Sequence, residues 1–247
     1  MKTIAVYCLM IGVVFSSSLY AAPASEPNEP WVSLFNGKDF TGWKIIGGRG
    51  KAWIQDGAIT CHQVSNTVEH AFVCTEKKYG DFILEADAKI EGQLHTGFLF
   101  RCIDTDPETA KVCLYGYQVK IDPTPRRWTG GIFDDYGDRW EWYYPLEKSE
   151  TARQAFKMNE WNHFRIEAIG NRLKVWVNGV PTTNLIHDKY DNGYIALKIH
   201  WMKDDPDREK VFMYYRNINI IDKKPSDYVK DMDYPVIDMT QAAAAEN

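Results

Sequence analysis

Residues capable of acid–base chemistry alternate with apolar residues along several extended segments of the chain. Side chains two residues apart in a β-strand point to the same face, so each segment has a polar and an apolar face. If these strands are neighbours, their polar positions form a floor that can bind a polyhydroxylated ligand and exchange protons with it. The alternative is an amphipathic sheet whose polar face is simply solvated. The residues of this predicted floor are Arg101, Gln118, Lys120, Asp122 and His200.

The segment that follows Asp122 is rich in aromatic and charged residues. Residues 126–145 contain seven aromatic and seven charged side chains. Aromatic rings stack on the C–H faces of sugars, while Arg and Asp bind hydroxyl groups, so this segment is a candidate wall for a sugar site. The alternative is a surface loop whose aromatics pin it to the scaffold. The predicted substrate contacts are Gln118, Arg127, Trp128, Asp134, Trp140 and His95, the last at the start of the Arg101 segment.

The sequence lacks the motifs of several common enzyme and nucleotide-binding families. It contains no HExxH, GxSxG, P-loop or GxGxxG pattern and no evident pair of glycosidase carboxylates. The net charge of −5 argues against a nucleic-acid partner. No cofactor is identified, and a divalent metal stays an open alternative. The aromatic content of 14% fits both strand packing and a sugar site, and composition does not separate these two uses.

The N-terminus has the pattern of a secretory signal. Lys2 precedes an apolar run over 4–15 and small residues up to Ala21, so we expect a signal peptide over 1–21, a flexible leader over 22–30 and a periplasmic or secreted protein. Cys8 lies too early for a lipoprotein signal, and no later segment has the length of a membrane span. We expect the sandwich domain over 31–221 and a C-terminal extension over 222–247. Oligomeric state is not indicated.

Four cysteines follow the predicted signal peptide. Export permits disulfides, and four cysteines allow three pairings. Because polar connections separate Cys61 from Cys74 and Cys102 from Cys113, we predict these two local disulfides. The alternative is reduced thiols that pack as small apolar groups. Zinc is disfavoured because none of the pairs has CxxC spacing.

Period-two alternation dominates the chain and predicts an all-β fold. Such segments occupy 82–90, 97–102, 115–122, 163–169, 172–178, 194–201 and 212–221. Gly170-Asn171 and Asn178-Gly179 predict hairpin turns. No long amphipathic helix is evident, and the best short helix candidate is 149–158. Many short strands with turn residues between them predict a jelly-roll-like sandwich of two antiparallel sheets.

The order and spacing of ten short stretches resemble the 3-keto-disaccharide hydrolase family, also described as 3-keto-glucoside 1,2-lyase/3-keto-2-hydroxy-glucal hydratase domains. The sequence departs from the family pattern at His95-Thr96-Gly97, where Asn-Ser-Gly is usual, and at Tyr117, where an acidic residue is usual. The matching stretches are 34–43, 53–59, 79–82, 96–101, 116–122, 129–134, 160–162, 177–179, 197–200 and 215–218.

The resemblance implies a concanavalin-like jelly-roll β-sandwich and an enzyme that cleaves glycosides already oxidised at C3. A 3-keto group acidifies the C2 proton, so a base can remove it and the C1 substituent leaves by elimination, followed by hydration of the glucal. The alternative is a non-catalytic carbohydrate-binding module, since a fold does not fix a function. The expected roles are His200 as base or acid, Asp122 as its partner or a metal ligand, and Arg101 and Lys120 as oxyanion stabilisers.

Overall fold

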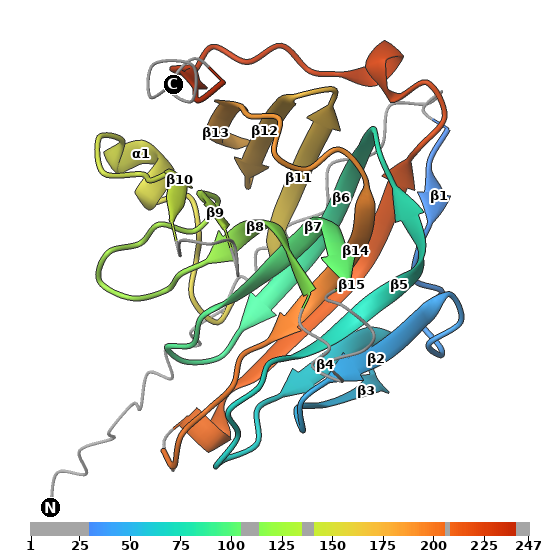
Figure 1. Cartoon of the computed structure of the whole chain (residues 1–247). Helices are drawn as coiled ribbons and strands as arrows, with labels where there is room; N and C mark the ends of the chain where they lie inside the picture. The colour runs from blue at the N-terminus through green and yellow to red at the C-terminus, as the bar shows by residue number, and fades with distance from the viewer. Residues whose placement is uncertain (1–29, 105–113, 135–140, 206–207, 241–247) are drawn as a thin grey trace, which may run out of the picture.

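The computed structural model describes residues 30–104, 114–134, 141–205 and 208–240. These residues form two packed β-sheets, and their largest core cluster contains side chains from both (Figure 1). The all-β sandwich predicted from the alternation is therefore confirmed. The predicted signal peptide, residues 22–29 of the leader, Trp140 and Cys113 lie outside the described residues.

All strand pairs are antiparallel except β13 with β16. The nine-stranded sheet has the order β16 (Ile237–Asp238), β13 (Val180–Ile186), β12 (Arg172–Val177), β11 (Asn162–Ile169), β6 (Phe82–Ile90), β15 (Phe212–Ile221), β4 (Ala58–His62) and β3 (Lys51–Gln55), with β1 (Val32–Ser33) beside β15. The seven-stranded sheet has the order β10 (Trp142–Tyr144), β9 (Ile132–Asp134), β8 (Leu114–Ile121), β7 (Thr96–Asp104), β14 (Gly193–Ile199), β5 (Ala71–Tyr79) and β2 (Trp43–Gly47).

Alternation sorts the side chains of the seven-stranded sheet onto two faces. Phe98, Val119 and Leu197 belong to the large cluster between the sheets. Leu99 and Ala196 belong to a smaller cluster on the other face, which we call the outer face of this sheet. Gln118 lies opposite Leu99 in the register, so the polar positions of β8 share this outer face.

The predicted hairpin turns are confirmed. Gly170 connects β11 to β12, and Asn178-Gly179 connects β12 to β13, all three with positive φ of 51–78°. Asn and Gly tolerate this left-handed backbone, which the tight turns of twisted hairpins require. The predicted helix over 149–158 is much shorter than expected. Its α-helical part is α1 (Glu150–Arg153), where the Ser149 side chain accepts a hydrogen bond from Ala152 N.

One β-bulge overturns the prediction, made from strict alternation, that Arg101 belongs to the polar floor. The register of β7 with β8 shifts between Phe100 and Ile103, and Arg101 has a φ of 51°. An extra residue reverses the facing of every side chain beyond it. Cys102 therefore joins the outer cluster, whereas Phe98 and Phe100 pack in the main core.

The predicted Cys61–Cys74 disulfide is wrong. Cys61 is a free thiol on β4 that packs in the main core, and Cys74 on β5 packs in the smaller outer cluster of the other sheet. Burial raises the pKa of the Cys61 thiol, so it stays protonated and packs as a small apolar group. Because Cys113 lies outside the described residues, the Cys102–Cys113 bond stays a prediction.

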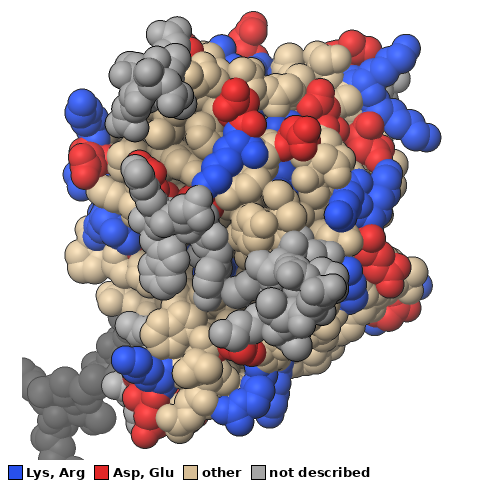
Figure 2. All heavy atoms as spheres, in the orientation of Figure 1, with Lys and Arg blue, Asp and Glu red and all other residues tan. Residues whose placement is uncertain are grey.

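Residues after β15 run back across the nine-stranded sheet. This segment includes the 3₁₀ turns η3 (Pro225–Tyr228) and the short strand β16, and Figure 1 shows it, in red, passing β11, β12 and β13. Arg165 and Asn184 donate hydrogen bonds to the carbonyls of Tyr228 and Tyr234. A second 3₁₀ turn, η2 (Arg208–Lys210), precedes β15. Basic and acidic side chains are interspersed over the face seen in Figure 2.

Candidate active site on the outer face of the seven-stranded sheet

Four of the five predicted floor residues lie together on the outer face. Lys120 lies opposite Gly97, Asp122 follows the end of β8, and His200 follows the end of β14. Strand β7 lies between β8 and β14, and Leu99 is its outward side chain beside Gln118. Gly97 leaves room between the rows, because a Cβ there would lie 2.8 Å from the Gln118 Nε2 atom.

A row of one carboxylate and three histidines crosses four neighbouring strand ends. Asp122, His95, His200 and His70 come from the ends of β8, β7, β14 and β5 in that spatial order. His95 Nδ1 lies 3.4 Å from Asp122 Oδ1. The His95 and His200 rings are 6.5 Å apart, and the His200 and His70 rings are 4.5 Å apart. The row therefore spans the length of a sugar-sized ligand.

Hydrogen bonds set the tautomers of two of these histidines. His200 Nδ1 lies 2.7 Å from the carbonyl oxygen of Trp201, so this nitrogen carries the proton and the neutral ring has its lone pair on Nε2. His70 Nδ1 instead accepts a hydrogen bond from Trp201 N at 3.0 Å, which places the proton of His70 on Nε2. The adjacent Asp122 carboxylate favours the Nδ1–H form of His95.

His70 is held neutral. Burial, followed by the charges of Lys198, His200 and Lys120, lowers its pKa far below the usual value of 6.5. A neutral His70 fixes Trp201 and His200 without adding a proton of its own to the site. The cationic neighbours also show that two lysine charges lie within electrostatic reach of the histidine row.

Two buried lysines lie at the bottom of the site. Lys120 and Lys198 are 7% and 1% exposed, whereas the His95 side chain is 31% exposed. Lys120 Nζ donates to Gln118 Oε1 at 3.4 Å and lies 4.6 Å from the centre of the Phe133 ring. Gln118 Nε2 in turn donates to the Thr96 carbonyl. Shielded cations act on negative charge more strongly than solvated ones.

Asp122 is anchored on all sides. Its carboxylate accepts hydrogen bonds from Thr124 Oγ1 at 2.7 Å and from Arg126 Nε at 2.8 Å, with Arg126 Nη2 2.7 Å away. Its backbone N donates to Thr129 Oγ1. This fully buried carboxylate also accepts a hydrogen bond from Thr124 N and lies beside the ring of His95, so it is rigid. Asp122 is placed to orient His95, whereas the sequence prediction paired it with His200.

Part of the predicted aromatic wall is present beside this row. The Trp128 and Trp142 rings meet edge to face at 4.9 Å, and Phe133 packs against Trp142 at 5.3 Å. The Arg126 guanidinium lies 4.7 Å from the centre of the Trp128 ring. Tyr143 and Tyr144 belong to the core instead. The wall is thus built from Trp128, Phe133 and Trp142.

Arg101 is not part of this site, which corrects the sequence prediction. The bulge turns its side chain to the opposite end of β7, where it is 1% exposed. There it donates hydrogen bonds to the carbonyls of Gly80, Gly170 and Tyr190 at 2.7–3.1 Å. It also lies 3.2 Å from the Asp81 carboxylate. Arg101 ties three connections of the sandwich together, a structural role.

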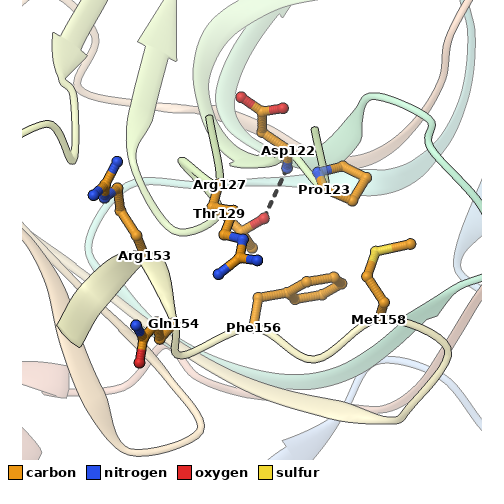
Figure 3. Close-up of a pocket in the computed structure, with 8 residues that line it drawn as sticks. All are labelled: Asp122, Pro123, Arg127, Thr129, Arg153, Gln154, Phe156 and Met158. Atoms are coloured by element: carbon orange, nitrogen blue, oxygen red, sulfur yellow. Dashed lines mark hydrogen bonds between the residues drawn. The ribbon is translucent and has the colours of Figure 1, made fainter. Parts of the chain in front are cut away.

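Two other predicted contacts lie elsewhere. Asp134 is fully buried, and its carboxylate accepts hydrogen bonds from Tyr143 at 2.6 Å and Lys189 at 2.7 Å, away from the histidine row. Arg127 points to the other side of the 123–129 loop, away from Asp122 (Figure 3). Trp140 lies outside the described residues.

Sequence reasoning missed Lys198, His70 and Arg126. Lys198 had a usable signal, since it lies two residues before His200 and shares its face. Arg126 is four residues after Asp122, yet the loop between them gives no periodicity. His70 is 131 positions from Trp201, and only the pairing of β5 with β14 brings them together.

Two negative findings apply to the described residues. None of their His, Cys, Asp and Glu side chains form a group of three or more that could hold a metal ion. None of the helices in this part of the chain has the length and apolar character needed to cross a membrane.

Similar proteins share this fold. A family model described as a 3-keto-alpha-glucoside-1,2-lyase-like domain matches residues 30–221. Comparison with curated proteins gave no match. A Parabacteroides distasonis protein described as a candidate glycosyl hydrolase is 21% identical, with a TM-score of 0.56, over 78% of this chain and 94% of that one.

Two Bacillus subtilis structures are also similar. A galectin-like protein of unknown function is 12% identical, with a TM-score of 0.54, over 78% of this chain and 94% of that one. The carbohydrate-binding module CBM66 is 17% identical, with a TM-score of 0.51, over 72% and 93%. At these identities the similarity establishes the fold alone, a galectin-like jelly-roll sandwich, as predicted.

Proposed function

Because the chain belongs to the 3-keto-alpha-glucoside-1,2-lyase-like domain family, we propose that it is an exported enzyme that eliminates the C1 substituent of a 3-keto-glycoside. A base removes the C2 proton, the electrons of that C–H bond form the enolate of the 3-keto group, and collapse of the enolate breaks the C1–O bond. The C1 oxygen leaves with a proton, and water then adds to the resulting glucal.

The observation that carries the proposal is the convergence of two histidines over two buried lysines. His95, oriented by Asp122, and His200 supply the two proton-transfer groups that the elimination requires. Lys120 and Lys198 supply positive charge for the enolate oxygen in a shielded environment. The tryptophan wall beside Arg126 supplies a surface for the ring of the sugar.

The proposed roles differ from those inferred from sequence. His95 takes the role of base, because its side chain is partly exposed and the adjacent Asp122 carboxylate favours its Nδ1–H tautomer. His200 takes the role of acid or water activator. Lys198 replaces Arg101 as the second oxyanion stabiliser, since Arg101 lies at the opposite end of β7.

A nitrophenyl 3-keto-glucoside tests the reaction directly. We expect the protein to release nitrophenol from the 3-keto-glucoside and not from the unoxidised glucoside, and we expect deuterium at C2 to slow the release. Absence of release from both anomers, with and without added divalent metal, contradicts the proposal.

A second function, non-catalytic sugar binding, is favoured by one feature, the Trp128–Trp142 wall. It predicts saturable binding of glycans without a new chemical species. Calorimetry combined with product analysis separates the two functions. In both, Trp128→Ala weakens ligand binding, so product formation is the deciding readout.

A further inference from the structure

The 123–129 loop has a second side, away from the histidine row. On one side Arg126 holds Asp122 and stacks with Trp128. On the other side the loop lines a separate pocket of about 380 Å³. Figure 3 shows the Arg127 guanidinium directed into this pocket and the Asp122 carboxylate directed away from it. This pocket has a volume typical of a small-ligand site.

Unused arginine donors line the pocket. Within the described part of the chain the Arg127 side chain forms no hydrogen bond or ion pair. Arg153 pairs with Glu150 through Nη2, and its buried Nε–H has no acceptor among the described residues. A buried donor without a partner costs free energy that a bound acceptor recovers. The two guanidinium groups therefore favour an anion.

Glu150 does not neutralise both arginines. Its carboxylate already accepts hydrogen bonds from Arg153 and from Gln154 Nε2, and its side chain is more than half exposed. It reaches Arg127 only through a longer-range electrostatic interaction. An incoming carboxylate would thus meet one unpaired guanidinium and one available N–H group.

The rest of the pocket is apolar. Phe156 and Met158 follow α1 and pack against the main core cluster while lining the pocket. Figure 3 shows Phe156 below Arg127 and Met158 to its right. An inorganic anion would leave this surface without a partner, whereas an apolar ring or chain would cover it.

We propose that this pocket is a binding site for a small organic anion, a carboxylate attached to an apolar body. The carboxylate pairs with Arg127 and accepts the Nε–H of Arg153, and the apolar body lies on Phe156 and Met158. Asp122 and Thr129 also line the pocket, but neither arginine belongs to the histidine row, so the arginine variants test this site separately from the proposed elimination.

Calorimetric titration with benzoate tests the site, with the isosteric neutral amide benzamide as the matched ligand. We expect benzoate to bind with a Kd on the order of 1 mM. Arg127→Gln and Arg153→Gln are each expected to weaken benzoate binding at least about tenfold. Arg49→Gln, which removes an arginine that donates to the Asn66 carbonyl, is the control and leaves the Kd unchanged.

Three results overturn the proposal. The first is the absence of benzoate binding in the millimolar range, and the second is equal binding of benzamide. The third is unchanged binding in both arginine variants, which would place benzoate elsewhere. Thermal unfolding of each variant is measured in parallel, and the exposed Arg127 provides a test that does not depend on burial.

Discussion

The outer faces of the two sheets both carry histidines, carboxylates and cations, yet they differ in how charge is balanced. On the nine-stranded sheet, acids and bases alternate in one connected chain of ion pairs. Its contacts are Lys174–Glu167, Arg165–Glu167, Arg165–Glu85, His163–Glu85, His163–Asp87 and Arg216–Asp87, at 2.8–3.8 Å. On the seven-stranded sheet, Lys120, Lys198 and Arg126 share the outer face with three histidines and Asp122.

The two histidine environments show the consequence. For His163, burial lowers the pKa, but hydrogen bonds and charges from Asp87 and Glu85 outweigh it and raise the pKa to about 9. For His70, burial and cationic neighbours both lower the pKa. Paired charges fix a structure, whereas the positive charges of Lys120 and Lys198 near the neutral His70 suit the stabilisation of an anion. Under the proposed function, the outer face of the seven-stranded sheet carries the chemistry and that of the nine-stranded sheet contributes to stability.

The largest expected effect is on catalysis by the histidine row. We expect His95→Gln and His200→Gln each to lower kcat/KM for a 3-keto-glucoside by about 10²- to 10⁴-fold, as for loss of a general acid or base. The matched control is His62→Gln on the nine-stranded sheet, which should change kcat/KM less than about threefold. Equal losses in all three variants would break the assignment of chemistry to one face.

Replacement of the buried Lys198 is expected to affect activity far more than stability. Lys198→Met should lower kcat/KM by about 10²- to 10³-fold, because it removes positive charge from the developing enolate. It should change the unfolding free energy by less than about 1.5 kcal/mol, because methionine occupies nearly the same volume as the buried lysine stem. Urea denaturation and steady-state kinetics measure both. A loss of stability with normal activity would make Lys198 a structural residue.

Arg101 should behave in the reverse way. Arg101→Met removes the donor of three carbonyl groups, one of them the buried carbonyl of Tyr190, and leaves Asp81 without its ion pair, so we expect a loss of about 3 kcal/mol in unfolding free energy. The folded fraction should keep kcat/KM within about threefold of the parent. Denaturation curves give the unfolding free energy, and kcat/KM is calculated with the concentration of folded protein. A selective loss of kcat in a stable variant would return Arg101 to the site.

The smallest effect concerns the pH dependence of stability. Because the folded pKa of His163 is raised from 6.5 to about 9, its contribution is complete below pH 6.5 and is lost as the pH rises through 9. We expect the parent to exceed His163→Asn in unfolding free energy by on the order of 2 kcal/mol at pH 6 and to converge with it above pH 9. Denaturation at several pH values measures this difference. A difference independent of pH would remove the ion-pair explanation.

Strand alternation predicted the sandwich and much of the polar face. Gln118 and Lys120 lie within the regular strand β8 and Asp122 directly follows it, so alternation placed all three on the correct face. Arg101 was misplaced because a bulge with positive φ interrupts β7, and nothing in the adjacent residues marks it. The partner of Asp122 was also missed. Strand pairing, which brings His95, His200 and His70 together, depends on long-range register that one sequence does not reveal.

Exchange of the C2 proton tests the central claim most directly, since it reports proton abstraction before the C1 bond breaks. A 3-keto-glucoside deuterated at C2 is followed by NMR in the presence of the parent, His95→Gln and His163→Asn. We expect the parent and His163→Asn to remove deuterium from C2 at matching rates, whether it is lost from the substrate by exchange or during product formation. With His95→Gln this loss should be slower by at least about 10²-fold. Equal deuterium loss with His95→Gln and the parent, or loss that fails only with His163→Asn, would contradict it.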